Sequence, residues 1–120
     1  MNTDVVAHQL KPLPAREFEA ILARLDAGEG SRDDLKAATK HLLAVLTQRH
    51  PGNSVEVRIL PFAAVQCLAG ARHTRGTPPA VVEMDAETWV AVARGRLAWV
   101  DARISASGER SDLSPLMPLV

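Results

Sequence analysis

The chain has 120 residues, enough for one domain with a buried core, and 47% of these residues are hydrophobic. Its fourteen acidic and fourteen basic residues cancel, so bulk charge argues against a nucleic-acid or membrane-surface binder. The single cysteine excludes an intramolecular disulfide, and no signal peptide or transmembrane segment is visible, so we expect a cytoplasmic protein.

The first half of the chain predicts two helices that follow a polar arm. Residues 1–13 are expected to form a loose arm, and residues 14–50 the two helices. Ser31 and Asp34 have the spacing of a capping box that opens the second helix, which ends near His50. The first helix is predicted by apolar residues at helical spacing: Phe18, Ile21, Leu22 and Leu25.

Two strands are predicted next. Residues 55–60 alternate between apolar and mainly polar side chains, which indicates a strand with one buried face. Residues 62–69 are apolar on both faces except for Gln66, which predicts a central strand covered on each side. Pro61 separates the two segments, and the sequence is compatible with either a tight hairpin or a bend in one long strand.

Residues 81–117 predict a strand, a helix, a short helix, a second strand and an apolar tail. Asp85 is placed to cap the helix, and Gly95 to end it with a positive φ angle. Met84 and Trp89 have the spacing of a hydrophobic staple around the cap. The second strand is predicted by alternating residues: Ile104, Ala106 and Gly108.

This order of elements predicts the α+β class, because two helices precede a cluster of strands and a strand–helix–strand return follows. We expect a four- to five-stranded, mostly antiparallel sheet with helices on one face. The whole chain, residues 1–120, is expected to form a single domain, with residues 54–119 as its sheet-and-helix body.

The sequence contains no arrangement typical of catalysis or of cofactor binding. The four histidines are scattered, no metal-ligand spacing occurs, and no phosphate-binding glycine motif is present. Cys67 falls in a strand pattern and is expected to be a small buried hydrophobic residue rather than a nucleophile. We therefore expect no catalytic residues, no cofactor, no metal and no enzymatic activity.

One loop and the tail stand out as candidate binding segments. No acidic residue occurs between Val57 and Val82, so Arg72, His73 and Arg75 could hold a phosphate or carboxylate group. The alternative is a solvated turn whose arginines pair with distant acids. The tail either completes the core or covers an apolar cavity, and because Pro115 and Pro118 limit regular helix, we expect a lid.

The run VVEMDAETWVAVARGRLAWVDARISASGERSDLSPLMPL resembles the sterol carrier protein 2-like fold. With SVEVRILPFAAVQC and ARHTRGTPPAVVE, the chain is similar over residues 54–119 to small stand-alone bacterial sterol carrier family proteins. This resemblance implies a sheet and helices around an apolar tunnel that binds a lipid or fatty acyl chain without covalent chemistry. An alternative is a protein-interaction or regulatory module that kept the fold and lost the tunnel.

A ligand site on this fold has two expected parts. The anionic head group is expected at the loop residues named above, Arg72, His73 and Arg75. The apolar wall of the cavity is expected to consist of these residues: Phe62, Val65, Trp89, Trp99, Leu113, Leu116 and Met117.

Overall fold

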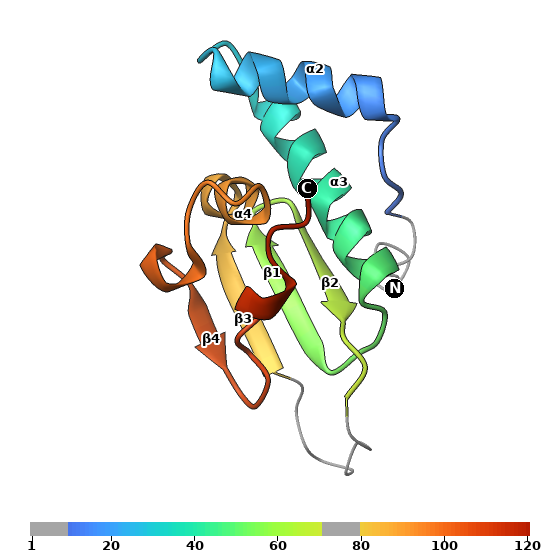
Figure 1. Ribbon diagram of the computed structural model, residues 1–120, viewed down its shortest axis with the longest axis vertical. Coiled ribbons are helices and arrows are strands. Elements are labelled where there is room, and N and C mark those ends of the chain that lie inside the picture. The colour runs from blue at the N-terminus through green and yellow to red at the C-terminus, as the bar shows by residue number, and fades with distance from the viewer. Residues whose placement is uncertain (1–9, 71–79) are drawn as a thin grey trace.

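A computed structural model describes residues 10–70 and 80–120 (Figure 1). Within these residues the elements are, in chain order, α2 (Ala15–Asp26), α3 (Arg32–Arg49), β1 (Val55–Leu60), β2 (Ala63–Cys67), β3 (Ala80–Asp85), α4 (Ala86–Ala93), the 3-10 turn η1 (Trp99–Asp101), β4 (Ser105–Ser107) and the 3-10 turn η2 (Ser114–Leu116). The predicted α+β class is confirmed, with the two leading helices and the strand–helix–strand return in their expected places.

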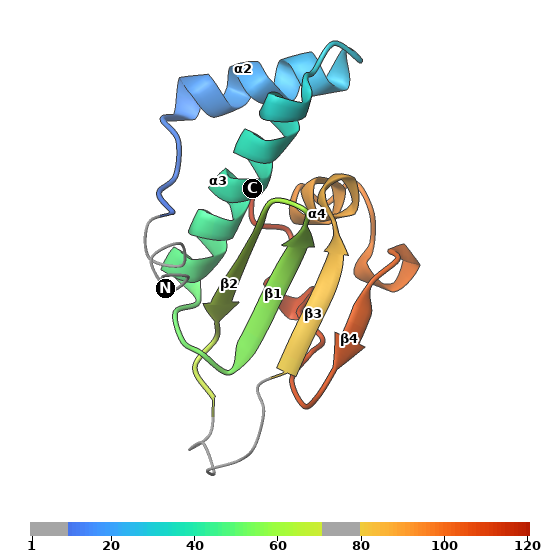
Figure 2. The same cartoon turned by 180° about the vertical axis from the view of Figure 1, so that it is seen from behind.

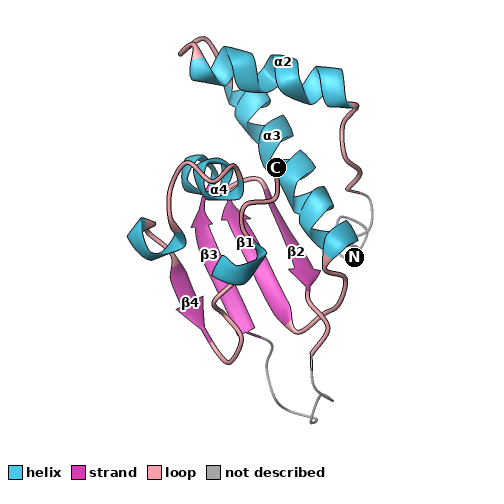
Figure 3. Cartoon of the chain, viewed as in Figure 1, coloured by secondary structure: helices cyan, strands magenta, loops and turns pink. Residues whose placement is uncertain are grey.

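The described strands form one four-stranded sheet in the order β2-β1-β3-β4 (Figure 3). Strand β1 pairs antiparallel with β2 and parallel with β3, and β3 pairs antiparallel with β4. The sheet is therefore mixed, although most of its pairings are antiparallel as expected. The alternation predicted for β1 is also confirmed, because Val55, Val57 and Ile59 are fully buried at the centre of the sheet.

The expectation of a central strand in residues 62–69 is wrong, because β2 lies at one edge of the sheet. Val65 and Cys67 are buried in β2, whereas Ala64 and Gln66 are exposed. The residues looked apolar on both faces because alanine counts as apolar, yet so small a side chain can face water at little cost. The pairing of Ile59 with Ala63 shows that Pro61 lies in a tight hairpin turn.

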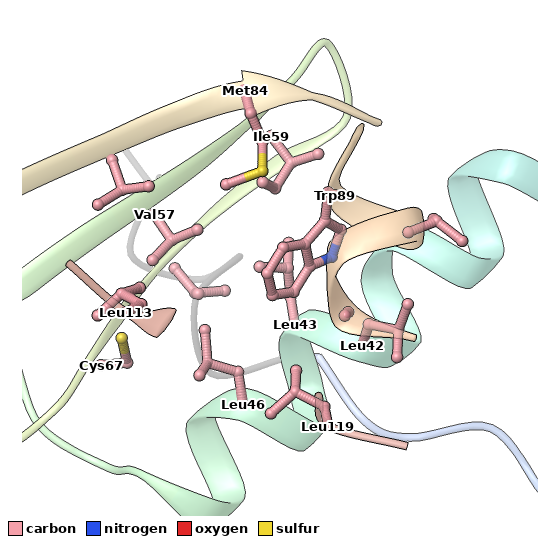
Figure 4. Close-up of a cluster of buried hydrophobic side chains, with 14 of the residues drawn as sticks. Leu42, Leu43, Leu46, Val57, Ile59, Cys67, Met84, Trp89, Leu113 and Leu119 are labelled. Atoms are coloured by element: carbon pink, nitrogen blue, oxygen red, sulfur yellow. The ribbon is translucent and has the colours of Figure 1, made fainter. Parts of the chain in front are cut away.

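The described helices cover one face of the sheet, as predicted. Comparison of Figures 1 and 2 shows α3, α4 and the C-terminal tail on one side and, within the described residues, an uncovered face on the other. The core lies between the covered face and these segments (Figure 4). Its largest fully buried side chains are Trp89, Leu42, Leu43, Leu46, Ile59, Leu113 and Leu119.

Local hydrogen bonds fix the ends of the helices where the sequence predicted them. The Ser31 hydroxyl accepts from the Asp34 N–H at 3.0 Å, and the Asp34 carboxylate accepts from the Ser31 N–H at 3.1 Å. The Asp85 carboxylate accepts from the Thr88 N–H at 2.8 Å and so caps α4. Gly95 has a φ of 74°, which allows the chain to leave α4 abruptly.

Helix α2 packs on α3, and its carboxyl-terminal end is held by ion pairs. The Asp26 carboxylate accepts from the guanidinium groups of Arg94 and Arg96, at 2.9 Å and 3.0 Å. Arg24 donates two hydrogen bonds to Asp34 at the start of α3. These contacts attach the end of α2 to the start of α3 and to the segment that follows α4.

Strand β4 is short and solvent-exposed at the second edge of the sheet. Its residues Ser105–Ser107 pair with β3, and Gly108 follows with a φ of 89°. A Cβ at Gly108 would lie 2.8 Å from the Ala80 Cα, so only glycine fits where the chain turns away from β3.

Candidate functional site

The C-terminal tail crosses the covered face of the sheet and brings apolar side chains to the core. Leu113 and Leu119 are almost completely buried, and the Leu119 N–H donates to the Ala93 carbonyl at 2.8 Å at the end of α4. The expected lid is therefore not observed, since the tail is part of the core. Pro115 and Pro118 prevent a long helix, as expected. In place of helical hydrogen bonds, the bond to Ala93 and the burial of two leucines hold the tail in position.

A groove of about 260 Å³ lies between the end of β2 and this tail. We call it the tail groove. It is lined by Leu68, Ala69, Arg110, Asp112, Leu113, Pro115 and Leu116. Apolar side chains from both segments form its walls, and the described lining also includes a cation, Arg110, and an anion, Asp112. This combination suits one end of an amphiphilic molecule.

Arg110 is the cationic group of the tail groove. Its guanidinium donates from Nη1 to the Ala69 carbonyl at 2.7 Å, which joins the tail to the end of β2. A guanidinium carries five N–H donors, so its bond to Ala69, the one recorded within the described residues, leaves further donors for a carboxylate or a phosphate. Arg110 also has a positive φ of 66°, which places it at a sharp turn after β4.

The anionic group, Asp112, is committed to the backbone of the tail. Its carboxylate accepts from the Ser114 N–H at 2.9 Å, and this bond lowers the pKa of Asp112 below its ordinary value. Asp112 therefore stays ionised and fixes the first turn of η2. In the tail groove its role is to shape the wall next to Leu113.

The structure divides the predicted wall residues into three groups. Leu113 and Leu116 line the tail groove. Val65 and Trp89 are buried in the core, and Figure 4 shows that Trp89 points into the same interior as Leu113. The other predicted wall residues are partly buried and pack against this core: Phe62, Trp99 and Met117.

The predicted head-group residues Arg72, His73 and Arg75 lie outside the described residues, so their role stays a prediction. The tail groove nevertheless reaches Ala69, close to the point where the described chain stops at Gly70. Sequence reasoning missed Arg110, which follows a polar turn and resembles any solvated arginine. Its partner Ala69 is 41 residues away, so no local pattern could reveal the contact.

Cys67 is buried on the core face of β2, and burial raises the pKa of its thiol to about 11. At pH 8 about one thiol in a thousand would be ionised, compared with about a quarter for an exposed cysteine of ordinary pKa near 8.5. We expect a polar thiol reagent to label the native protein at least about a hundredfold more slowly than the urea-unfolded protein. Equal labelling rates in the two states would show that Cys67 is accessible.

No helix in the described ranges is long and apolar enough to cross a membrane, and no cluster of potential metal ligands occurs in them.

Comparisons with known proteins agree with this architecture. No curated protein matches the chain. Residues 31–119, from the cap of α3 to the buried Leu119, match the sequence model of a family described as bacterial SCP ortholog. Since this match spans most of the chain, the protein belongs to the bacterial sterol carrier protein family.

Proposed function

We propose that this protein binds a lipid or another molecule with an apolar chain, non-covalently and without catalysing a reaction. The family suggests a lipid-carrier role, and the tail groove supplies a place where such a ligand could bind. The observation that supports the proposal most directly is that leucine side chains and the Arg110 guanidinium line the same groove. A cytoplasmic location is part of the same proposal.

The groove favours a particular part of the ligand. Its volume of about 260 Å³ is slightly below the roughly 300–1,000 Å³ typical of sites that enclose a drug-sized molecule. The groove would therefore hold the polar end and the first carbons of an amphiphile. Leu113 and Leu116 would contact the methylene groups, each of which contributes about 0.8 kcal/mol when buried, and Arg110 would pair with an anionic end.

Arg110→Gln tests this assignment through the charge of the ligand. The dissociation constant for dodecanoate should rise about ten- to a hundredfold, because a hydrogen bond to a charged group contributes about 1.5–3 kcal/mol. The dissociation constant for dodecanol should change little, since the alcohol carries no charge. Isothermal titration calorimetry below the micelle concentration measures both constants.

Two further variants complete this experiment. Arg16→Gln removes an equal charge from the exposed surface of α2, and it should leave both dissociation constants unchanged. Leu116→Asp places a carboxylate in the groove wall and should weaken both ligands. Unchanged dodecanoate binding in both Arg110→Gln and Leu116→Asp would exclude the tail groove as the binding site.

A second candidate function, protein interaction, is favoured by the uncovered face of the sheet (Figure 2). At its centre, Arg58 donates to the Glu56 carboxylate and lies 3.9 Å from Glu83. A polar face of this kind suits a weakly bound protein partner better than a lipid. Native mass spectrometry of the protein from its own host separates the two functions, because a co-purified lipid supports carriage and a stoichiometric protein complex supports interaction.

A further inference from the structure

His41 lies away from the tail groove and connects its own helix, α3, to the segment before α2 and to the start of α2. It lies on α3 and is 7% exposed. Its Nδ1 accepts a hydrogen bond from the Leu13 N–H at 2.8 Å, in the segment that leads into α2. The Phe18 ring, in the first turns of α2, stacks on the imidazole with centroids 3.8 Å apart and planes 22° apart. One side chain therefore holds both the entry segment and the beginning of α2.

This contact exists only while His41 is neutral. A ring nitrogen can accept a hydrogen bond only when it carries no proton, and both nitrogens of an imidazolium are donors. Protonation would set two N–H groups against each other at Leu13, inside a partly buried site. Burial also lowers the pKa of His41, so the neutral form is favoured while the site is closed.

No neighbouring charge in the described chain offsets this preference. The ionisable side chains of the entry segment and the first turns of α2 are Lys11, Arg16, Glu17 and Glu19, and the one next to His41 on α3 is Lys40. Those of the entry segment and α2 are exposed, and among the described residues none of these groups forms an ion pair or hydrogen bond with His41. Desolvation is the cause of the lowered pKa.

We propose that His41 is an acid-sensitive latch, which holds the start of α2 on α3 when neutral and releases it when protonated. The latch is stable above the ordinary histidine pKa of 6.5 and weakens as the pH falls below that value, because the open state binds a proton that the closed state excludes. The far end of α2 stays attached, since the pKa of Asp26 is lowered by Arg94 and Asp26 remains ionised. Acid therefore releases Leu13 and Phe18 from His41, while the ion pairs of Asp26 keep the other end of α2 in place as a hinge.

The latched segment also lies outside the family match, which begins at residue 31. Residues 10–30 are attached to the matched part of the chain at one end by His41 and at the other by ion pairs. Release of the first turns of α2 uncovers the apolar faces of Phe18 and Ile21, both buried in the closed state. The latch is therefore a means to expose apolar surface in response to acid, independent of the tail groove.

Hydrogen exchange followed by NMR tests the latch at a single amide. The protection factor of the Leu13 amide, corrected for the intrinsic pH dependence of exchange, should fall up to about tenfold between pH 7.5 and 5.5. The amide of Val57 in β1 should keep its protection over the same range, which shows that the domain stays folded. The nitrogen-15 shifts of His41 should show an unprotonated Nδ1 at pH 7.5.

His41→Asn is the matched variant, because its side-chain oxygen can accept from Leu13 but does not titrate. Its Leu13 protection should not depend on pH. A wild-type protection factor that stays constant, or an equal fall in His41→Asn, would overturn the latch. If His41→Asn does not fold, the wild-type shifts decide the question, since a proton on Nδ1 at pH 7.5 is incompatible with the proposed bond.

Discussion

Replacing Trp89 by alanine is expected to lower the free energy of unfolding by about 3–5 kcal/mol, the usual cost of removing a buried large aromatic side chain. Trp89 is fully buried at the centre of the core (Figure 4), and its Nε1 donates to the Thr39 carbonyl at 3.2 Å. A loss of this size is a large part of the roughly 5–15 kcal/mol that stabilises a typical domain. Urea unfolding followed by circular dichroism measures the change.

Trp99→Ala provides the matched control. Trp99 has the same side chain but lies in η1, only partly buried against the edge of the core. Its replacement should cost clearly less than that of Trp89, because less apolar surface returns to water. Equal losses in the two variants would contradict the difference in burial that the structure shows.

The second large effect is expected at the end of the tail. Leu119→Ala should lower the free energy of unfolding by about 2–5 kcal/mol, because Leu119 is 1% exposed and packs in the core. Its neighbour Val120 is 52% exposed, and Val120→Ala should stay within about 0.5 kcal/mol of the wild type. Thermal unfolding of the two variants distinguishes adjacent positions that the sequence alone presents as equally apolar.

Deletion of residues 114–120 extends this prediction. The deletion removes Leu119 together with the backbone hydrogen bonds from Leu119 and Val120 to the Ala93 carbonyl. We expect the cooperative unfolding transition to be lost, because a domain of this size has little stability to spare. Cooperative unfolding of the truncated protein would contradict the role of the tail in the core and would support the lid that the sequence predicts.

Features that depend on neighbouring residues could be predicted from the sequence. The caps at Ser31 and Asp85 and the glycine after α4 each combine a side chain with a backbone group a few residues away. Such local hydrogen bonds and turns form in almost the same way in any fold, so the amino-acid sequence alone identifies them. The alternation in β1 is equally informative, because that strand has one apolar and one mainly polar face.

The remaining features depend on contacts between distant residues. The position of β2 at the edge is set by the pairing of β1 with β3, and nothing within residues 62–69 encodes it. The bond from Arg110 to Ala69 and the bond from Leu13 to His41 join residues 41 and 28 positions apart. The core position of the tail likewise depends on a distant contact, the hydrogen bond from the Leu119 N–H to the Ala93 carbonyl at the end of α4.

The shortness of β4 has a consequence for the behaviour of the protein at high concentration. A sheet with one uncovered face can recruit strands from other molecules along a free edge and grow into aggregates. At the β4 edge of the sheet the described chain offers only the three residues of β4, and Gly108 turns the chain away immediately afterwards. Three residues provide too few backbone hydrogen bonds for a foreign strand to remain attached. The turn at Gly108 thus protects this edge of the sheet from self-association.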